Sequence, residues 1–181
     1  MFGIKIGKIP PNRGPSKWPG EYHSLRVLLS PVAEALRPLW WATEHAVFAF
    51  PPAWMSEEWQ HPDYLGGPSI QKFDSSFLPD VKPPVARLGF LPTFANAISG
   101  DWSILHGLID DPSRNPKLLE ALGRIGWFDP PTNFPPESSV SIRGIDWAYW
   151  EVFARDRNLI VAVHEHLKDV QGLKLELLNP A

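Results

Sequence analysis

Proline is the residue that most constrains how this chain can fold. The 181 residues include 21 prolines, about twice the average usage of proline in proteins. They cluster in four places, at residues 10–19, 51–52, 79–92 and 130–136. Because proline lacks a backbone N–H and has a fixed φ, these clusters predict short helices and strands joined by ordered, proline-rich loops.

The segments between the proline clusters are apolar enough to build a core. Hydrophobic residues make up 44% of the chain and aromatic residues 12%, with nine tryptophans. We expect one compact domain over residues 1–181, with residues 1–20 as a basic, Pro- and Gly-rich N-terminal segment. The tryptophans predict either an aromatic-rich core or indoles displayed to a partner.

Several classes of protein are disfavoured by what the sequence lacks. There is no cysteine, which excludes disulfides, thiolate zinc sites and cysteine nucleophiles. The chain has neither a secretory signal nor a run of about 18 uncharged apolar residues, and it contains no glycine motif for binding phosphate. We therefore expect a soluble cytoplasmic protein that uses no cofactor or metal and does not associate with membranes.

The net charge of −3 is distributed unevenly. Residues 1–40 carry six basic and two acidic side chains, whereas residues 41–181 carry 11 basic and 18 acidic ones. Nucleic-acid-binding domains usually present a basic stripe, so this acidic body disfavours binding to DNA or RNA. An acidic body suits a protein that recognises a basic partner, and a solvated acidic surface is the commoner alternative.

The last third of the chain has the clearest pattern of elements. The segments "SVSIR" and "DWAYWEVFA" alternate as strands. Asp156 is expected to cap a helix over residues 157–170, and "LKLELL" at 173–178 alternates as a further strand. These elements predict a C-terminal β-α-β unit.

Helix and strand signals are also present between the proline clusters. Ser30 followed by proline predicts a helix over residues 31–37. Asn115 followed by proline predicts another helix, which Gly126 is expected to end in a left-handed conformation. Gly172 is expected to end the helix predicted over residues 157–170. The segment 85–91 is apolar enough for a strand.

Together with a short N-terminal strand in "GIKIGKI", these elements predict an α+β fold. We expect a mixed or antiparallel sheet of about four to six strands, covered by about three or four helices.

Two histidine-containing segments resemble metal sites only in composition. In "VHEH", His164 and His166 point about 200° apart on a helix, whereas helical metal sites place histidines four residues apart. In "EEWQH", Glu58 and His61 are spaced as in di-iron bundles, but the chain has only one such copy. We interpret Glu57 and Glu58 as the first turn of a short helix, and as acidic candidates for a binding surface.

The segment "GDWSILHG" contains Asp101, Ser103 and His106, which are the residue types of a hydrolase triad. Triad members seldom lie so close along a chain, and no G-x-S-x-G elbow exposes the serine. Asp101 is therefore expected to be a turn or cap residue, and His106 is a weak catalytic candidate.

Glu151 is the residue of greatest interest. The residues that share its face of the strand are Trp147, Tyr149 and Phe153. A carboxylate buried in this aromatic row must be paired or have a raised pKa. We expect it to pair with an arginine such as Arg143 or Arg155; the alternatives are a place on a binding surface and a catalytic role.

These observations favour a non-enzymatic protein-binding module. One concrete version is a bacterial inhibitor or immunity-type protein that blocks a basic partner through an acidic, aromatic-rich surface. The candidate binding residues are Trp147, Tyr149, Glu151, Glu57 and Glu58. The sequence leaves the oligomeric state open.

Two other functions are compatible with the sequence. One is a small cytoplasmic hydrolase that uses Glu151 and a histidine such as His106 in an aromatic pocket, and the other is a small-ligand carrier with tryptophans around its cavity. A deep pocket holding Glu151 and a histidine would favour the enzyme. An acidic face with exposed Trp or Tyr would favour the protein-binding module.

Overall fold

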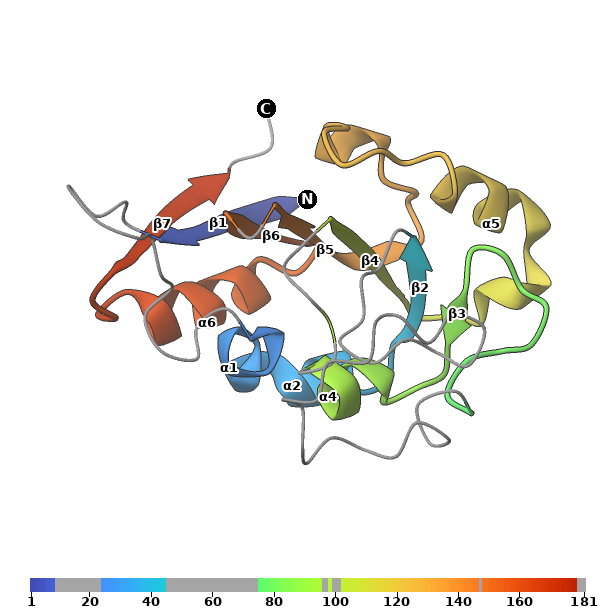
Figure 1. Ribbon diagram of the computed structural model, residues 1–181, viewed down its shortest axis with the longest axis horizontal. Coiled ribbons are helices and arrows are strands. Elements are labelled where there is room, and N and C mark those ends of the chain that lie inside the picture. The colour runs from blue at the N-terminus through green and yellow to red at the C-terminus, as the bar shows by residue number, and fades with distance from the viewer. Residues whose placement is uncertain (9–23, 45–74, 96–97, 99–101, 147, 179–181) are drawn as a thin grey trace, which may run out of the picture.

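A computed structural model of the protein describes residues 1–8, 24–44, 75–95, 98, 102–146 and 148–178. In this part of the chain, seven antiparallel strands form one sheet in the order β3-β2-β4-β5-β6-β1-β7 (Figure 1). The α+β class and the antiparallel sheet are as predicted, with more strands than expected.

Short elements dominate, as the proline clusters predict. The strands are β1 (Phe2–Lys8), β2 (Trp40–Glu44), β3 (Val85–Ala86), β4 (Ser103–Leu108), β5 (Ser138–Ile145), β6 (Tyr149–Ala154) and β7 (Leu173–Leu178). The α-helices of the described residues are α1 (Leu25–Leu28), α2 (Ala33–Leu36), α4 (Phe90–Phe94), α5 (Pro116–Leu122) and α6 (Arg157–Leu167). The 3-10 turns of the described residues are η1 (Ser30–Val32), η4 (Pro112–Arg114) and η5 (Pro131–Asn133).

The predicted C-terminal β-α-β unit is formed by β6, α6 and β7. The Asp156 side chain caps α6 by accepting a hydrogen bond from the N–H of Asn158 at 2.9 Å. Gly172, which was expected to end the helix, lies just before β7 and has a φ of +86°, a left-handed conformation that glycine adopts readily. β1 lies between β6 and β7 and is antiparallel to both. The N-terminal strand thus occupies an interior place in the sheet.

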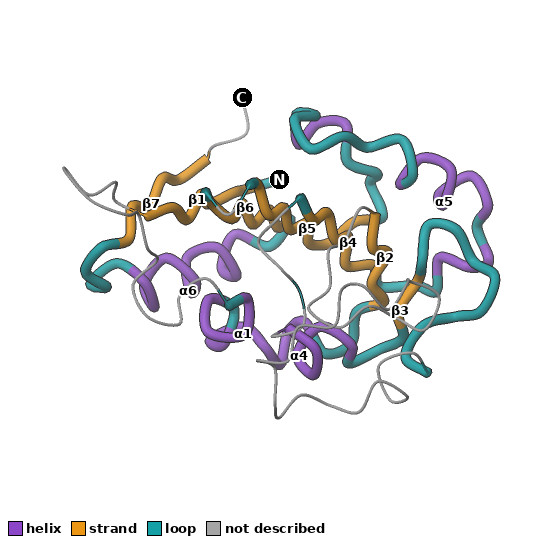
Figure 2. The backbone as a smooth tube through the Cα atoms, in the orientation of Figure 1, coloured by secondary structure: helices purple, strands orange, loops and turns teal. Residues whose placement is uncertain are grey.

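One face of the sheet is covered by helices and holds the main core. Figures 1 and 2 show α6, α1 and α4 lying along this face. Ile4 and Ile6 of β1 are fully buried beneath them. The predicted apolar stripe of α6 is buried here through Leu159, Ile160, Val163 and Leu167.

The two histidines of α6 diverge, as their spacing predicts. His164 Nδ1 lies 3.5 Å from a carboxylate oxygen of Glu165. His166 Nε2 lies 3.2 Å from the carbonyl oxygen of Val27 and 3.3 Å from the hydroxyl of Ser30. His166 therefore connects the end of α6 to both α1 and η1.

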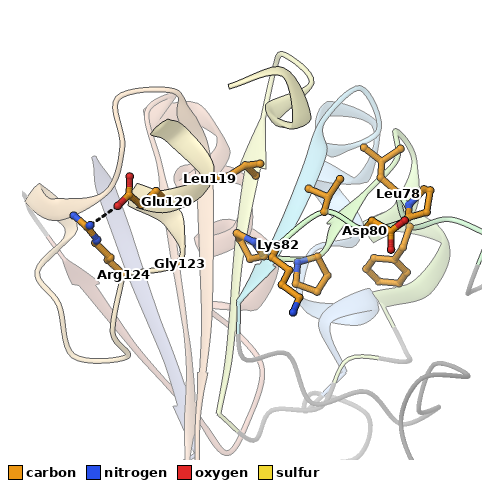
Figure 3. Close-up of a pocket in the computed structure, with 12 residues that line it drawn as sticks. Leu78, Asp80, Lys82, Leu119, Glu120, Gly123 and Arg124 are labelled. Atoms are coloured by element: carbon orange, nitrogen blue, oxygen red, sulfur yellow. Dashed lines mark hydrogen bonds and ion pairs between the residues drawn. The ribbon is translucent and has the colours of Figure 1, made fainter. Parts of the chain in front are cut away.

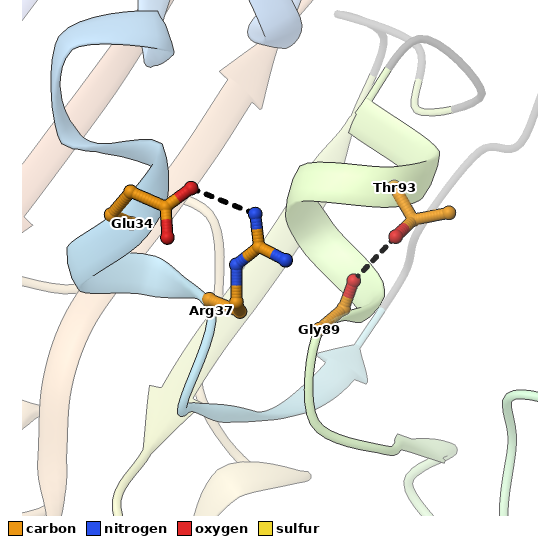
Figure 4. A network of polar contacts seen from close by, with 4 residues as sticks. All are labelled: Glu34, Arg37, Gly89 and Thr93. Atoms are coloured by element: carbon orange, nitrogen blue, oxygen red, sulfur yellow. Dashed lines mark hydrogen bonds and ion pairs between the residues drawn. The ribbon is translucent and has the colours of Figure 1, made fainter.

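A small polar network joins α2 to the start of α4 (Figure 4). Arg37 pairs with Glu34 at 2.7 Å, and the carbonyl of Arg37 accepts a hydrogen bond from the N–H of Gly89. Gly89 has a φ of +76°, and its own carbonyl accepts from the Thr93 hydroxyl at 2.8 Å. This left-handed glycine turns the chain from β3 into α4.

The turn at Gly89 corrects the strand predicted over residues 85–91. Only Val85 and Ala86 form β3, and α4 follows because Phe90, Leu91 and Phe94 bury one helical face.

Three further predictions about helices differ from the structure. The helix predicted over residues 31–37 begins as the 3-10 turn η1, and only Ala33–Leu36 forms an α-helix, α2; a further single turn, α1, precedes η1. The single turns α1 and α2 raise the number of α-helices in the described residues to five, compared with the three or four expected. Asn115 caps α5 as predicted, but α5 ends at Leu122, and Gly126 does not have a positive φ. The helix predicted over residues 53–61 lies outside the described residues.

Candidate functional site

The second face of the sheet carries a row of alternating charges. Cross-strand register places Arg143 opposite Glu151, Glu151 opposite Lys5, and Lys5 opposite Glu176. We call these four residues the charge row; it crosses β5, β6, β1 and β7. Figure 1 shows α5 and the chain after it above the β4 side of the sheet, whereas no described helix lies above β1 and β7.

Arg143 carries a buried charge on this face, and several neighbouring groups contact it. A guanidinium nitrogen lies 2.8 Å from Glu151 Oε2, and the two side chains are only 5% and 13% exposed. The guanidinium also lies over the ring of Phe153, 5.0 Å from its centroid. The predicted pairing of Glu151 with Arg143 is therefore present, and Arg155 instead donates to the carbonyls of Ser138 and Pro135.

Arg143 also fixes the loop that follows α5. Its Nη1 donates to the carbonyl oxygens of Trp127 at 2.8 Å and Asp129 at 2.7 Å. Phe128 lies between these two anchored residues, and its side chain is 74% exposed. The buried Glu151–Arg143 pair thus holds a loop that displays a phenylalanine to solvent.

Trp102 contacts the ring of Phe128 on one side. The ring of Trp102 meets those of Trp127 and Phe128 edge to face, with centroids 5.1 and 6.0 Å apart. Trp102 precedes Ser103, whose partner in β5 is Gly144, so it lies at the end of the sheet where β5 turns into β6. We call Trp102, Phe128 and Tyr149, together with the carboxylates of Asp129 and Asp146, the Phe128 surface.

Two residues of this surface have strained backbones. Trp102 has a φ of +43° and Asp146 a φ of +46°, values that L-residues with a side chain rarely adopt. Strain of this kind persists where surrounding contacts enforce it, and it is concentrated at functional sites.

Tyr149 and Lys5 extend the surface toward β1. Lys5 Nζ lies 3.8 Å from the centroid of the Tyr149 ring, a cation–π contact. Burial raises the pKa of the Tyr149 phenol, and the Glu151 carboxylate raises it further, against an opposing effect of Arg143. The phenol is therefore neutral at physiological pH and available as a hydrogen-bond donor.

His106 lies on the same face as Glu151 but is fully buried. Its Nδ1 is 2.8 Å from the Ser141 hydroxyl, and its ring contacts that of Phe134 edge to face. Burial, and secondarily the charge of Arg143, lowers the pKa of His106 to about 3. Ser103 lies three positions away on β4, so its side chain points to the opposite face, and the two do not form a dyad.

Neither His106 nor Glu151 lines any of three cavities that lie among the described residues. The largest of these three, about 970 Å³, lies between residues 77–84 and α5 (Figure 3). No tryptophan is among the residues that line it. The hydrolase and small-ligand carrier interpretations remain predictions.

The candidate binding residues are only partly placed by the structure. Tyr149 and Glu151 lie together on the second face, as predicted, whereas Trp147, Glu57 and Glu58 lie outside the described residues. Sequence reasoning missed Phe128 and Trp102. A signal for Phe128 was present in "GWFDPP", where two adjacent aromatic residues stand between a glycine and a proline pair, in loop context.

Comparison with known proteins does not identify a relative. No family model matches the chain, and no curated protein or solved structure is significantly similar to it. None of the helices in the described ranges has the length and apolar character needed to cross a bilayer. Within the same ranges, no three histidine or carboxylate side chains cluster as a metal site would require.

Proposed function

We propose that the protein binds a basic protein partner through the Phe128 surface, as a non-enzymatic inhibitor of the immunity type. The observation that carries this proposal is the display of Phe128, which is 74% exposed between two residues anchored to a buried arginine. Aromatic residues are enriched at protein interfaces, and a loop that is already fixed loses little conformational entropy on binding.

The charges around Phe128 favour a basic partner. Asp146 is exposed at the turn between β5 and β6, and Asp129 directly follows Phe128. The nearby positive charge of Arg143 is already paired with Glu151 inside the protein. Carboxylates at the rim of an aromatic patch would steer a basic protein toward it and disfavour acidic competitors.

In this proposal Glu151 is a positioning residue. It compensates the buried charge of Arg143, and Arg143 in turn holds the carbonyls on either side of Phe128. This assigns the carboxylate in the aromatic row a role in supporting a binding loop.

A matched pair of alanine variants tests the proposal. Tagged protein would be used to isolate the partner from the host, and its affinity would then be measured by calorimetry for the parent, Phe128→Ala and Val161→Ala. Val161 is an exposed aliphatic residue on α6, in the helix layer. We expect Phe128→Ala to weaken binding about 30-fold or more, as truncation of an interface hot spot does, and Val161→Ala to leave it unchanged.

The salt dependence of binding provides a second readout. The affinity for a basic partner should fall as salt is added, because exposed charges are screened. The proposal is wrong if no stoichiometric partner is recovered, or if the two alanine variants bind the recovered partner equally well.

A further inference from the structure

The two edges of the sheet differ in how they are protected. β3 is two residues long, and its outer side is bridged by Phe77, which pairs with Ala86. β7 is six residues long and is hydrogen-bonded to β1 on one side, and in Figure 1 no described element lies beyond it. It has no proline, and its pairing with β1 continues from Leu173 to Leu178. A strand of this kind presents unpaired N–H and C=O groups to other strands.

The sequence of β7 is complementary to itself when read antiparallel. Its residues are Leu-Lys-Leu-Glu-Leu-Leu, with Lys174 and Glu176 placed symmetrically about Leu175. In an antiparallel pair of two copies centred on Leu175, Lys174 of each copy faces Glu176 of the other. Opposite charges that face each other across strands stabilise a sheet.

The two faces of such a pair also match the two faces of the sheet. Lys174 and Glu176 are exposed on the same face as the charge row. Lys174 of the second copy would therefore follow Glu176 and continue the alternation of charge. On the helix-covered face, Leu177 is 55% exposed, and the same register places it opposite Leu173 of the second copy.

We propose that β7 pairs antiparallel with β7 of a second copy of this chain, which joins two seven-stranded sheets into one across a two-fold axis. A lysine on an edge strand usually discourages pairing. In the register centred on Leu175, Glu176 of the second copy neutralises the charge of Lys174. The two charges therefore favour this partner and this alignment over others.

Charge reversal tests this interface. The dimer dissociation constant would be measured by sedimentation over a concentration series for the parent, Lys174→Glu and Lys117→Glu. In a K174E dimer, the new carboxylate of each copy faces Glu176 of the other copy. Its cross-strand neighbour within the subunit is Gly7, which carries no charge. We expect dimerisation to weaken about tenfold. Lys117 is exposed on α5, so K117E makes the same change of net charge away from the edge and should leave dimerisation unchanged.

A mixing experiment distinguishes this register from any other interface. Glu176→Lys should also weaken the homodimer, because lysines then face each other across the axis; within the subunit it also places a lysine opposite Lys5. An equimolar mixture of K174E and E176K places two carboxylates opposite two lysines across the axis, so it should dimerise more tightly than either variant alone. The proposal is overturned if the parent remains monomeric, if K174E dimerises like K117E, or if the mixture does not associate. Circular dichroism of each variant verifies that its fold is retained.

Discussion

Arg143 determines what the second face of the sheet can do. Arg143 is almost entirely buried, and its Nη1 and Nη2 groups contact two backbone carbonyls and one carboxylate, whereas its buried Nε has no hydrogen-bond partner. Burial of a charge is tolerated only with such pairing. Arg143 holds the loop that displays Phe128, and its charge also adds to the effect of burial in lowering the pKa of His106.

His106 makes stability depend on pH. Burial lowers the pKa of His106 from 6.5 to about 3, with a smaller contribution from Arg143. The unfolded chain therefore binds a proton at this residue below pH 6.5, whereas the folded protein binds it only near pH 3. Stability linked to His106 is complete above pH 6.5 and falls as the pH drops toward 3. At pH 5 the expected loss is about 2 kcal/mol, at about 1.4 kcal/mol per pH unit.

Urea unfolding at pH 8 and pH 5 measures this loss. In His106→Gln the difference in unfolding free energy between the two pH values should be smaller than in the parent by about 2 kcal/mol. Ser141→Ala removes the hydrogen-bond partner of His106 but keeps the imidazole, so its pH dependence should stay close to that of the parent. Equal pH dependence in H106Q and the parent would contradict this account.

At the scale of elements, two glycines provide a matched comparison. Gly172 has a φ of +86° before β7, whereas Gly126, in the loop after α5, has no positive φ. Gly172→Ala should cost about 1–2 kcal/mol of unfolding free energy, because a Cβ disfavours the left-handed conformation. A Cβ at Gly126 would meet only Asp129, at 3.7 Å, so Gly126→Ala should cost clearly less. Thermal unfolding of both variants checks the difference, and equal losses would be inconsistent with it.

Elements with local signals were predictable from the sequence. The cap at Asp156, the stripe of α6 and the alternation of β7 all lie within a short stretch, and each has its own periodicity or capping residue. The pairing of Glu151 with Arg143 was predictable for the same reason, because β5 and β6 are consecutive antiparallel strands.

Features without a local signal were not predictable. β2 was missed because its own sequence, Trp-Trp-Ala-Thr-Glu, has no clean alternation of apolar and polar residues. The display of Phe128 depends on Arg143, which reaches carbonyls 14 and 16 positions earlier in the chain. No periodicity encodes a contact of that kind.

At the scale of the whole molecule, β1 supports the sheet from its interior. Ile4 is fully buried, with Val152 of β6 on one side and Leu177 of β7 on the other. Ile4→Ala should therefore cost about 2–5 kcal/mol of unfolding free energy, as truncation of buried aliphatic residues does. Leu88→Ala truncates an exposed aliphatic residue and should stay within about 0.5 kcal/mol of the parent. Chemical denaturation would measure both, and similar losses would argue against an interior role for β1.

Because both neighbours of β1 come late in the chain, β1 cannot pair until they have been synthesised. Its neighbours begin at Tyr149 and Leu173, so Lys8 is made 141 and 165 positions before them. At about 5–20 residues per second, a ribosome needs roughly 7–30 s to reach even the first of these strands. During that interval Ile4 and Ile6 have no strand to pair with, and they are accessible to chaperones. A nascent chain released before Tyr149 lacks both neighbours of β1, so quality-control proteases should recognise it as unfolded.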